Sequence, residues 1–451
     1  MKFDPAVLIA DPTRREKILA VLTEALAAAD PFAAMQRFLV REGDVLRVAD
    51  RQYDLSKYRR VFVIGAGKAG APMVRAVEAT LGDRVQNGIV VVKTGHGGPT
   101  HTVTLVEAEH PRPNQAGVDA GNRILALAES AQEDDLVIAV LSGGGSALLV
   151  APAQGLTLQD IQKMTDALLA SGATINEVNC LRKHVSAVKG GQLAREVAPA
   201  TLVTLALSDV IGSPLDVIAS GPTVPDQTTW EDAWAIVKRF DLETSLPQPI
   251  VARLQAGLSG ELADTPKPDD PVFRTSQTVV VADNRVAAQA AARRAEELGY
   301  HSMLLTTYLE GEASEVARVA VGLGREIEAF DSPIAAPACL ILGGETTVTL
   351  GDNPGMGGRN QELALAAGIA LHGDDRIVVA SLATDGTDGP TDSAGGIGDG
   401  ATVERGRQAG LEAEEYLRAH NAYPFLEAAG DLLVTGPTQT NVNDIVFVFV
   451  D

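Results

Sequence analysis

Short runs of branched apolar residues alternate with amphipathic segments along most of the chain. The runs show no polar alternation, as expected for strands that are buried on both faces of a parallel sheet. Between them, apolar residues recur at helical spacing, and an amphipathic segment at about residues 14–29 predicts a helix before the first run. Strands that alternate with helices predict βαβ units. The strands are predicted at 61–67, 88–95, 136–146 and 201–209, and in a second block at 278–283, 301–307, 338–345, 376–386, 431–436 and 445–450.

The alternation is interrupted at residues 247–271, where Pro, Gly, Asp and Ser accumulate without a strand pattern. A chain of 451 residues also exceeds what one hydrophobic core usually supports. We therefore predict an α/β fold with two α/β domains and the active site in the cleft between them. The larger, Rossmann-like domain with a mostly parallel sheet is expected at 1–246, a linker at 247–271, and the second α/β domain at 272–451.

The net charge of −22 is strongly negative. Such a chain repels nucleic acid and anionic lipid, so a small-molecule substrate is favoured over either partner. The two cysteines are far apart, and the seven histidines lack a zinc-ligand spacing. The first residues do not resemble a signal peptide, and the most apolar stretch, 136–153, is interrupted by glycines. We expect a cytoplasmic protein without a membrane partner, and leave open a homodimer as its assembly.

The first glycine-rich turn reads GAGKAG, between a predicted strand and a predicted helix. Gly65 and Gly67 let a ligand approach the backbone, and the helix start offers free N–H groups to a phosphate. A purely structural tight turn is the alternative. Lys68 places a cation inside the loop, and the next strand ends in Lys93 rather than in the acidic residue that holds an NAD ribose. The turn therefore favours a phosphate over NAD, although Lys93 is compatible with NADP.

The second glycine-rich turn reads SGGGS and follows a wholly apolar predicted strand. Three consecutive glycines, Gly143, Gly144 and Gly145, permit a nest of backbone N–H groups around an anion. Ser142 and Ser146 add hydroxyl groups to the same loop. The alternative is a flexible connection between a strand and a helix.

Cations gather on one predicted helix and its continuation. Arg182 and Lys189 share a polar stripe with Asn179 and Ser186, next to the apolar face of that helix. In an acidic protein such a cluster indicates an anion site, with a solvated helix face as the alternative.

Arg359 begins another predicted helix after a glycine-rich loop. The helix dipole disfavours a cation at that end. A bound anion would remove this penalty, so Arg359 and the neighbouring Asn360 are predicted to bind a ligand. Packing of the arginine stem at the edge of the core is the alternative.

Acidic residues follow two of the predicted strands. Asp385, Asp388 and Asp392 lie on a glycine-rich loop after strand 376–386, and Asp209 ends strand 201–209. Mg²⁺ takes one or two carboxylates together with phosphate oxygens and water. Asp209 and Asp385 are therefore predicted as metal ligands or as acceptors of a proton, and an Asx-turn is the alternative for the loop.

These segments together resemble the glycerate 2-kinases that join a large amino-terminal domain to a carboxy-terminal MOFRL domain. The similarity runs in order over nearly the whole chain. Its segments are GAGKAG (65–70), EAEHPRPN (107–114), LSGGGSALL (141–149), VNCLRKHVSAVKGGQLA (178–194), SDVIGSPLDVIASGPT (208–223), GGETTVTL (343–350), GGRNQELALA (357–366), ATDGTDGPTDSAGG (383–396) and TGPTQTNVNDI (435–445).

The resemblance implies transfer of a phosphoryl group from ATP, with Mg²⁺, to the 2-hydroxyl of D-glycerate. It also implies that Lys68 and Arg359 form the catalytic pair. Two residues depart from the family pattern: Ser213 stands where an aspartate is frequent, and Gln439 stands in place of a glycine. Phosphoryl transfer asks a protein mainly to position reactants and to stabilise charge, which suits these loops and cations.

Two alternatives come from other functional classes. An NAD(P)H-dependent hydroxypyruvate reductase would also use a glycine-rich turn, but it would lack a need for ATP. A sensor of phosphorylated metabolites would keep the glycine loops and would have little use for the aspartate loop. Turnover with ATP distinguishes the kinase from both.

Overall fold

The structure is a computed structural model that describes residues 3 and 11–451. The chain divides into two compact units. The central unit is Pro31–Val281, and the terminal unit combines Met1–Asp30 with Ala282–Asp451. The predicted α/β class is confirmed in both units, each of which contains a six-stranded sheet with helices packed against it.

The central sheet has the strand order β6-β5-β4-β7-β8-β9, and the strands from β6 to β8 pair in parallel. Numbered along the chain from β4, this is the order 3-2-1-4-5-6 of doubly wound dinucleotide-binding sheets. The order reverses between β4 and β7, which is where such sheets bind their ligands. The strands are β4 (Arg60–Ala66), β5 (Val85–Lys93), β6 (Thr104–Ala108), β7 (Asp135–Leu141), β8 (Thr201–Leu207) and β9 (Ser276–Ala282).

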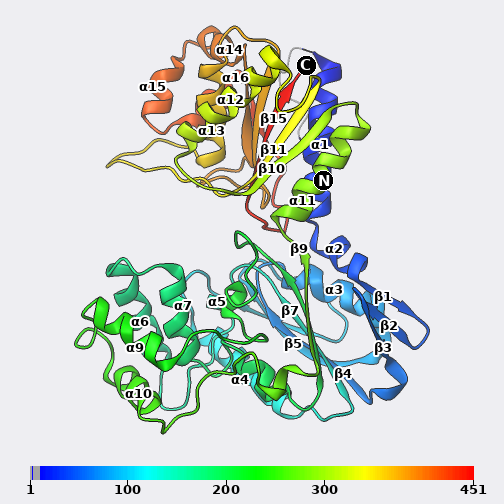
Figure 1. Ribbon diagram of the computed structural model, residues 1–451, viewed down its shortest axis with the longest axis vertical. Coiled ribbons are helices and arrows are strands. Elements are labelled where there is room, and N and C mark those ends of the chain that lie inside the picture. The colour runs from blue at the N-terminus through cyan, green and yellow to red at the C-terminus, as the bar shows by residue number, and fades with distance from the viewer. Residues whose placement is uncertain (1–2, 4–10) are drawn as a thin grey trace. The chain divides into compact units, whose positions relative to one another are not determined.

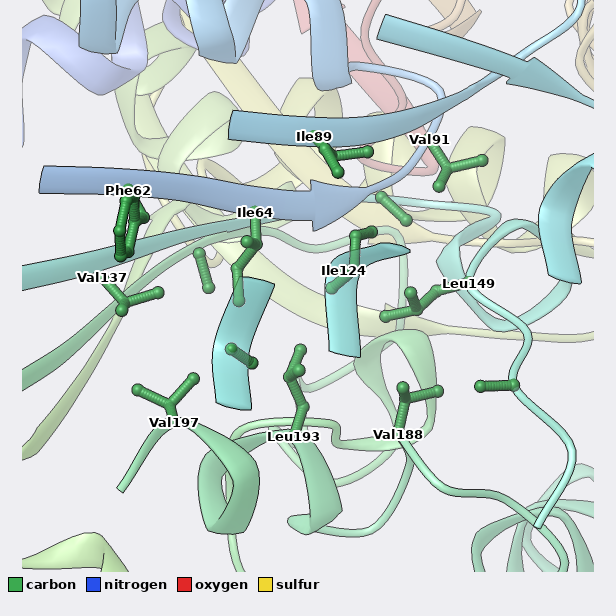
Figure 2. Packing of buried hydrophobic residues seen from close by; sticks show 14 of the residues in the cluster. Phe62, Ile64, Ile89, Val91, Ile124, Val137, Leu149, Val188, Leu193 and Val197 are labelled. Carbon is green, nitrogen blue, oxygen red and sulfur yellow. The ribbon is translucent and has the colours of Figure 1, made fainter. Parts of the chain in front are cut away.

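Two helices, α4 (Gln115–Glu129) and α8 (Gln192–Val197), cover one face of this sheet. Figure 2 shows Ile64 and Val137 pointing from the strands toward Ile124 of α4 and Leu193 of α8. The opposite face receives α3 (Gly70–Leu81), whose Val74 and Val77 are fully buried. Both faces are therefore covered, which explains why these strands are continuously apolar in sequence.

The central unit also contains parts that the strand pattern did not predict. A three-stranded antiparallel sheet forms at residues 39–54, and a helical lobe packs around Trp230 and Leu254 (Figure 1). Helices α6 (Leu158–Ala170) and α7 (Ile175–His184) of this lobe agree with the helical spacing predicted between the strands. The added elements are α2 (Pro31–Phe38), β1 (Leu39–Glu42), β2 (Val45–Val48), β3 (Arg51–Asp54), α5 (Gly145–Leu148), α9 (Trp230–Arg239) and α10 (Gln248–Leu258).

The terminal sheet is mixed, with the order β10-β11-β15-β12-β13-β14. The last strand of the chain, β15, lies antiparallel between β11 and β12. Helices α1 and α11 cover one face, and α12 and α13 cover the other (Figure 1). The elements are α1 (Pro12–Ala28), α11 (Asn284–Glu297), β10 (His301–Leu309), α12 (Ala313–Phe330), β11 (Ala338–Gly344), α13 (Arg359–Ala370), β12 (Ile377–Ala383), β13 (Gly395–Asp399), α14 (Thr402–Gln408), α15 (Ala413–Arg418), α16 (Ala422–Ala429), β14 (Leu432–Leu433) and β15 (Asp444–Val450).

This division differs from the predicted domain boundaries in three places. Helix α1, predicted within the first domain, packs in the terminal unit, where Arg14 contacts Asp451 at 2.7 Å. Strand β9, predicted in the second domain, completes the central sheet. The predicted linker contains α10, whose Ile250 is fully buried. Local composition missed these packing partners because each lies far away in sequence.

No single helix among residues 3 and 11–451 is long and apolar enough to cross a membrane. Helices α1 and α2 meet that criterion of length and composition only when they are taken together across a bend.

Candidate functional site

The two glycine-rich turns of the central unit interlock at the point where the strand order reverses. A Cβ at Gly65 would lie 1.9 Å from the carbonyl oxygen of Val140, and one at Gly67 would lie 2.0 Å from the hydroxyl oxygen of Ser142. The amide of Lys68 donates to Gly143 at 2.9 Å. These glycines are therefore required because the turns after β4 and β7 approach each other closely.

This interlocking uses the amide groups that GAGKAG was predicted to offer to a phosphate. Besides the Lys68 amide, that of Gly67 donates to Val91 and that of Ala69 to the Ser142 hydroxyl. The structural-turn alternative thus describes the backbone of this loop, and the Ser142 hydroxyl is committed to it. The Lys68 side chain stays available, because it has no hydrogen-bond acceptor or ion partner in the part of the chain that the structure describes.

The SGGGS loop keeps amide groups available. Within the described residues, the N–H groups of Gly143 and Gly144 have no acceptor, whereas that of Gly145 donates to Ser142 at 3.1 Å. Ser146 shares a hydrogen bond of 2.8 Å with the hydroxyl of Ser220. The anion-binding interpretation of this loop therefore rests on two adjacent amides.

Three polar side chains from different strand ends surround these amides. A Cβ added at Gly144 would lie 3.4 Å from the Lys68 Cγ and 3.2 Å from the His110 Nε2. The Asp209 carboxylate lies against Gly143, 2.1 Å from the corresponding built Cβ. A cation, an imidazole and a carboxylate thus converge at the carboxyl edge of one sheet, where open α/β sheets bind ligands.

His110 is the residue of this group that sequence reasoning missed. It follows β6, a strand that was not predicted, and the only signal was its place in the segment EAEHPRPN. Burial lowers the pKa of His110 to about 4, and the positive charges of Lys68 and Lys93 act in the same direction. His110 is therefore neutral near pH 7 and adds a polar group without adding charge.

Arg182 and Lys189 line a second, narrow cavity of about 30 Å³, together with Ser146 of the SGGGS loop. Burial lowers the pKa of both residues, that of Lys189 to about 7. The Lys189 ammonium donates to the carbonyl groups of Ser146 and Leu149, at 2.8 and 3.0 Å. Lys189 therefore holds the chain after the loop, and its structural role is the better supported one.

Arg182 differs from Lys189, because its guanidinium has no hydrogen-bond acceptor or ion partner across residues 3 and 11–451. It is half-buried at the end of α7. The cavity has room for roughly two water molecules, which is about the size of a carboxylate group. An unpaired, partly desolvated arginine in such a cavity is a natural receptor for a carboxylate.

The chain beside the SGGGS loop is strained. Ala219 and Ser220 have φ values of 51° and 62°, in the left-handed region that side chains other than glycine rarely adopt. The Cβ of Ala219 lies against Gly145, only 2.7 Å from a built Cβ. Strained backbone of this kind is frequent at ligand sites, because the surrounding structure holds it in place.

The second set of predicted residues lies in the terminal unit. Arg359 begins α13 as predicted, but protein carboxylates already balance its charge: it makes a two-point contact with Asp444 and contacts Glu345 at 2.9 Å. Burial acts to lower the pKa of Arg359, but Asp444 and Glu345 outweigh it and raise the pKa above the usual arginine value. The unfavourable interaction between Arg359 and the helix dipole is therefore offset by carboxylates of the protein itself.

Asn360 was predicted to bind a ligand, yet its side chain is fully buried. Its amide donates to Asp388 at 3.2 Å and accepts from Ser381 at 2.6 Å. Asp388 also accepts the backbone amides of Asn360 and Gln361, so it caps α13. Asn360 thus orients Asp388, and its part in ligand binding stays a prediction.

The aspartate loop is organised mainly by its own hydrogen bonds. Asp385 accepts the amide of Thr387 at 3.0 Å, as in an Asx-turn, and Asp392 accepts the Tyr423 hydroxyl at 2.8 Å. No three His, Cys, Asp or Glu side chains in the described ranges come together so that they could hold a metal. Mg²⁺ needs only one or two carboxylates when phosphates complete its shell, so Asp209 and Asp385 both stay predicted metal ligands.

Comparison with known proteins identifies the family of the chain. Residues 17–255 match the family described as "Domain of unknown function (DUF4147)", and residues 338–444 match the MOFRL family. A glycerate 2-kinase from Pyrococcus horikoshii is 41% identical over 97% of this chain and 97% of its own length. The chain belongs to the glycerate 2-kinase family.

Two further relatives add to this comparison. The crystal structure of glycerate kinase from Thermotoga maritima has a TM-score of 0.87 and 38% identity, over 97% of this chain and 99% of that one. A protein from Agrobacterium vitis with a provisional hydroxypyruvate reductase name is 41% identical over 98% of this chain and 95% of its own. The family resemblance predicted from the motifs is confirmed, and the reductase name recurs within the same family.

The two departures from the glycerate 2-kinase pattern both lie at left-handed positions. Ser213 has a φ of 51° and Gln439 a φ of 60°. Aspartate and glycine tolerate this region better than most residues do, which gives a backbone reason for the residues usual at these places.

Proposed function

We propose that this member of the family is an ATP-dependent glycerate 2-kinase that converts D-glycerate to 2-phosphoglycerate and ADP. The observation that carries the proposal is the cluster of Lys68 with the amides of Gly143 and Gly144. It presents a cation and two N–H donors, none engaged by another described group, at the ligand-binding edge of the central sheet. Such donors stabilise the negative charge on a phosphoryl group during its transfer.

Each polar group takes a role that its environment allows. Lys68 is proposed to supply positive charge to the transferring phosphoryl group, and the two loop amides to hold its oxygens. Arg359 is the second cation that the family resemblance assigns to catalysis. Asp209 is the carboxylate placed to accept the proton of the 2-hydroxyl or to hold a metal. Lys68 suits its role because no residue in the described part of the chain supplies a counter-ion to it.

The carboxylate of glycerate would lie against Arg182. Ser146 of the SGGGS loop also lines this narrow cavity, so the same short segment connects the acid-binding group to the phosphoryl-binding amides. A two-point contact between a guanidinium and a carboxylate fixes orientation as well as affinity. This would hold the 2-hydroxyl in a defined position relative to the loop.

Magnesium is the metal that such a transfer requires. When bound with ATP, Mg²⁺ would neutralise part of the charge of the phosphates. Asp209, which lies against Gly143, and Asp385, which accepts the amide of Thr387, are the residues proposed to hold it. The acidic chain, with a net charge of −22, is also consistent with a cytoplasmic enzyme of small molecules.

Hydride transfer to hydroxypyruvate is less well supported. A dinucleotide needs free amides in the first glycine-rich turn, and here Gly67, Lys68 and Ala69 donate to protein acceptors. Strand β5 ends in Lys93 and not in an acidic residue that would bind a ribose. Both features argue against NAD in the central unit.

A coupled assay of ADP release tests the proposal. Purified protein with Mg·ATP would be given D-glycerate, L-glycerate or hydroxypyruvate, and the product identified by NMR. We expect ADP release with D-glycerate and a phosphoryl group on its 2-hydroxyl. Oxidation of NADH with hydroxypyruvate in the absence of ATP would instead establish the reductase and reject the kinase.

A further inference from the structure

The terminal unit contains a cavity of about 450 Å³ at the start of α13. Val348, Leu350, Pro354 and Pro390 contribute apolar surface to its lining, and Arg359 is among its polar groups. This is the size range in which proteins bind nucleosides and similar organic ligands. A small hydroxy acid would fill only a minor part of it.

The charges of this cavity also disfavour a small acid. Three carboxylates, those of Glu345, Glu362 and Asp388, line it, against the guanidinium of Arg359. Three of the five N–H donors of Arg359 are already directed to Asp444 and Glu345. A free carboxylate would therefore meet more repulsion than attraction.

A neutral aromatic base is large enough for this cavity and is not repelled by its carboxylates. Planar rings bury well between proline and branched side chains, and they need few polar partners. The cavity provides such partners in a pair: the His420 Nδ1 and the Glu362 carboxylate lie 2.9 Å apart. The two N–H donors that remain on Arg359 are at the same time available to a phosphate.

We infer that this cavity binds the adenine and ribose of ATP. The inference rests on the proposed kinase function and deepens it by assigning the nucleoside to the terminal unit. The contrast with the 30 Å³ cavity at Arg182 supports the assignment, because the smaller, cationic space fits the acid substrate. Apolar contacts would hold the base, and the Glu362–His420 pair would face its polar edge.

The decisive variant is Leu350→Asp in the full chain. Leu350 lies in the cavity lining and is 59% exposed, so the change should leave the fold intact while placing a charge where the base would lie. Calorimetric titration should show the affinity for ATP reduced by about 10-fold or more and binding of adenosine lost. The affinity for tripolyphosphate and the KM for D-glycerate should not change.

Leu169→Asp is the matched control, because Leu169 is 62% exposed on α6 and lies outside the cavity lining. It should bind ATP and adenosine as the unaltered protein does. If Leu350→Asp binds ATP normally, or raises the KM for D-glycerate instead, the inference is overturned.

Photolabelling with 8-azido-ATP gives an answer that does not depend on a variant. We expect the label on peptides from 345–358, the loop that supplies much of the cavity lining. A label on the central unit would overturn the inference even if glycerate is phosphorylated. A label on 345–358 without phosphorylation of glycerate would support the nucleoside site and reject the kinase function.

Discussion

The central and terminal units hold their cations in opposite ways. In the central unit, Lys68 and Arg182 have no acidic partner among the described residues. In the terminal unit, Arg359 is bound by Asp444 and Glu345 before any ligand arrives. An unpaired, partly buried cation gains most from a ligand that supplies the missing negative charge, whereas a paired one is already oriented and gains less. We therefore expect substrate charge to be recognised mainly in the central unit.

The largest effect should come from Lys68→Ala. Removing this cation should lower kcat by roughly 10³-fold, because it stabilises charge that develops during transfer. The fold should persist, since no described side chain depends on the Lys68 ammonium. Steady-state kinetics and circular dichroism measure both. Lys57→Ala, at a lysine that is 78% exposed, is the control, and near-normal turnover of Lys68→Ala would reject its role.

Arg359→Met should combine a loss of activity with a loss of stability. Turnover should fall by about 10²-fold. The free energy of unfolding should fall by about 3 kcal/mol, because Asp444, only 5% exposed, loses its counter-ion. Denaturant unfolding and kinetics measure the two effects. Arg405→Met removes the counter-ion of buried Asp431 in the same unit, and should lose similar stability but keep its turnover. An equal loss of turnover in both variants would show that the effect of Arg359 is purely structural.

Arg182→Met should act on the acid substrate and leave ATP alone. The KM for D-glycerate should rise by about 10- to 100-fold, the range expected for a lost charged hydrogen bond. Stability should hardly change, because this guanidinium has no protein partner in the described structure. Arg253→Met changes another half-buried arginine of the central unit and should leave both KM values unchanged. A raised KM for ATP in Arg182→Met would contradict the assignment of the two cavities.

The titration of His110 should report binding at the SGGGS loop. In the free protein its pKa should be about 4, so it takes up a proton only in acid. An anion bound beside Lys68 would offset the positive charge that lowers this pKa, and should raise the pKa of His110 by about one pH unit or more. NMR titration with inorganic phosphate, with exposed His101 as the reference, measures the change. An unchanged His110 under saturating phosphate would place the anion elsewhere.

A folded-state pKa below the unfolded value also gives a sign for stability. His110 is neutral in the folded protein between pH 4 and 6.5, where the unfolded chain is protonated, so its contribution falls as the pH falls through that window. His110→Gln should therefore lose less stability between pH 6.5 and 4 than the unaltered protein does. Denaturant unfolding at both pH values tests the sign.

The smallest effect should come from Gln439→Gly. Gln439 is exposed and has a φ of 60°, so glycine relieves a strained conformation but makes the unfolded chain more flexible. The two effects oppose each other, and the free energy of unfolding should change by less than about 1 kcal/mol, with activity unchanged. Ala219→Gly, the similar change beside the SGGGS loop, should alter turnover. Unchanged turnover in both variants would show that the strained backbone at Ala219 has no role in activity.

Much of the candidate site could be predicted because the ends of buried strands can be recognised in the sequence. Each buried strand is a continuous apolar run, and Lys68, Gly143 and Asp209 were identified because they directly follow such runs. His110 escaped because β6 is short and only partly apolar. The partners of Arg359 escaped for another reason: Asp444 is distant in sequence and becomes a neighbour only when β15 inserts between β11 and β12.

The sequence by itself determined the α/β class, most strands, the two glycine-rich turns and the glycine-dependent loops, because these depend on local spacing and on backbone freedom. Only the tertiary structure decided which amides and charges remain available. The amides of Lys68 and Ala69 donate to the neighbouring turn and that of Gly67 donates to β5. Lys189 is held by two carbonyl groups and Asn360 by Asp388, while Lys68 and Arg182 have no partner among the described residues. Availability depends on every group that packs nearby, and those groups come from strands far apart in the chain.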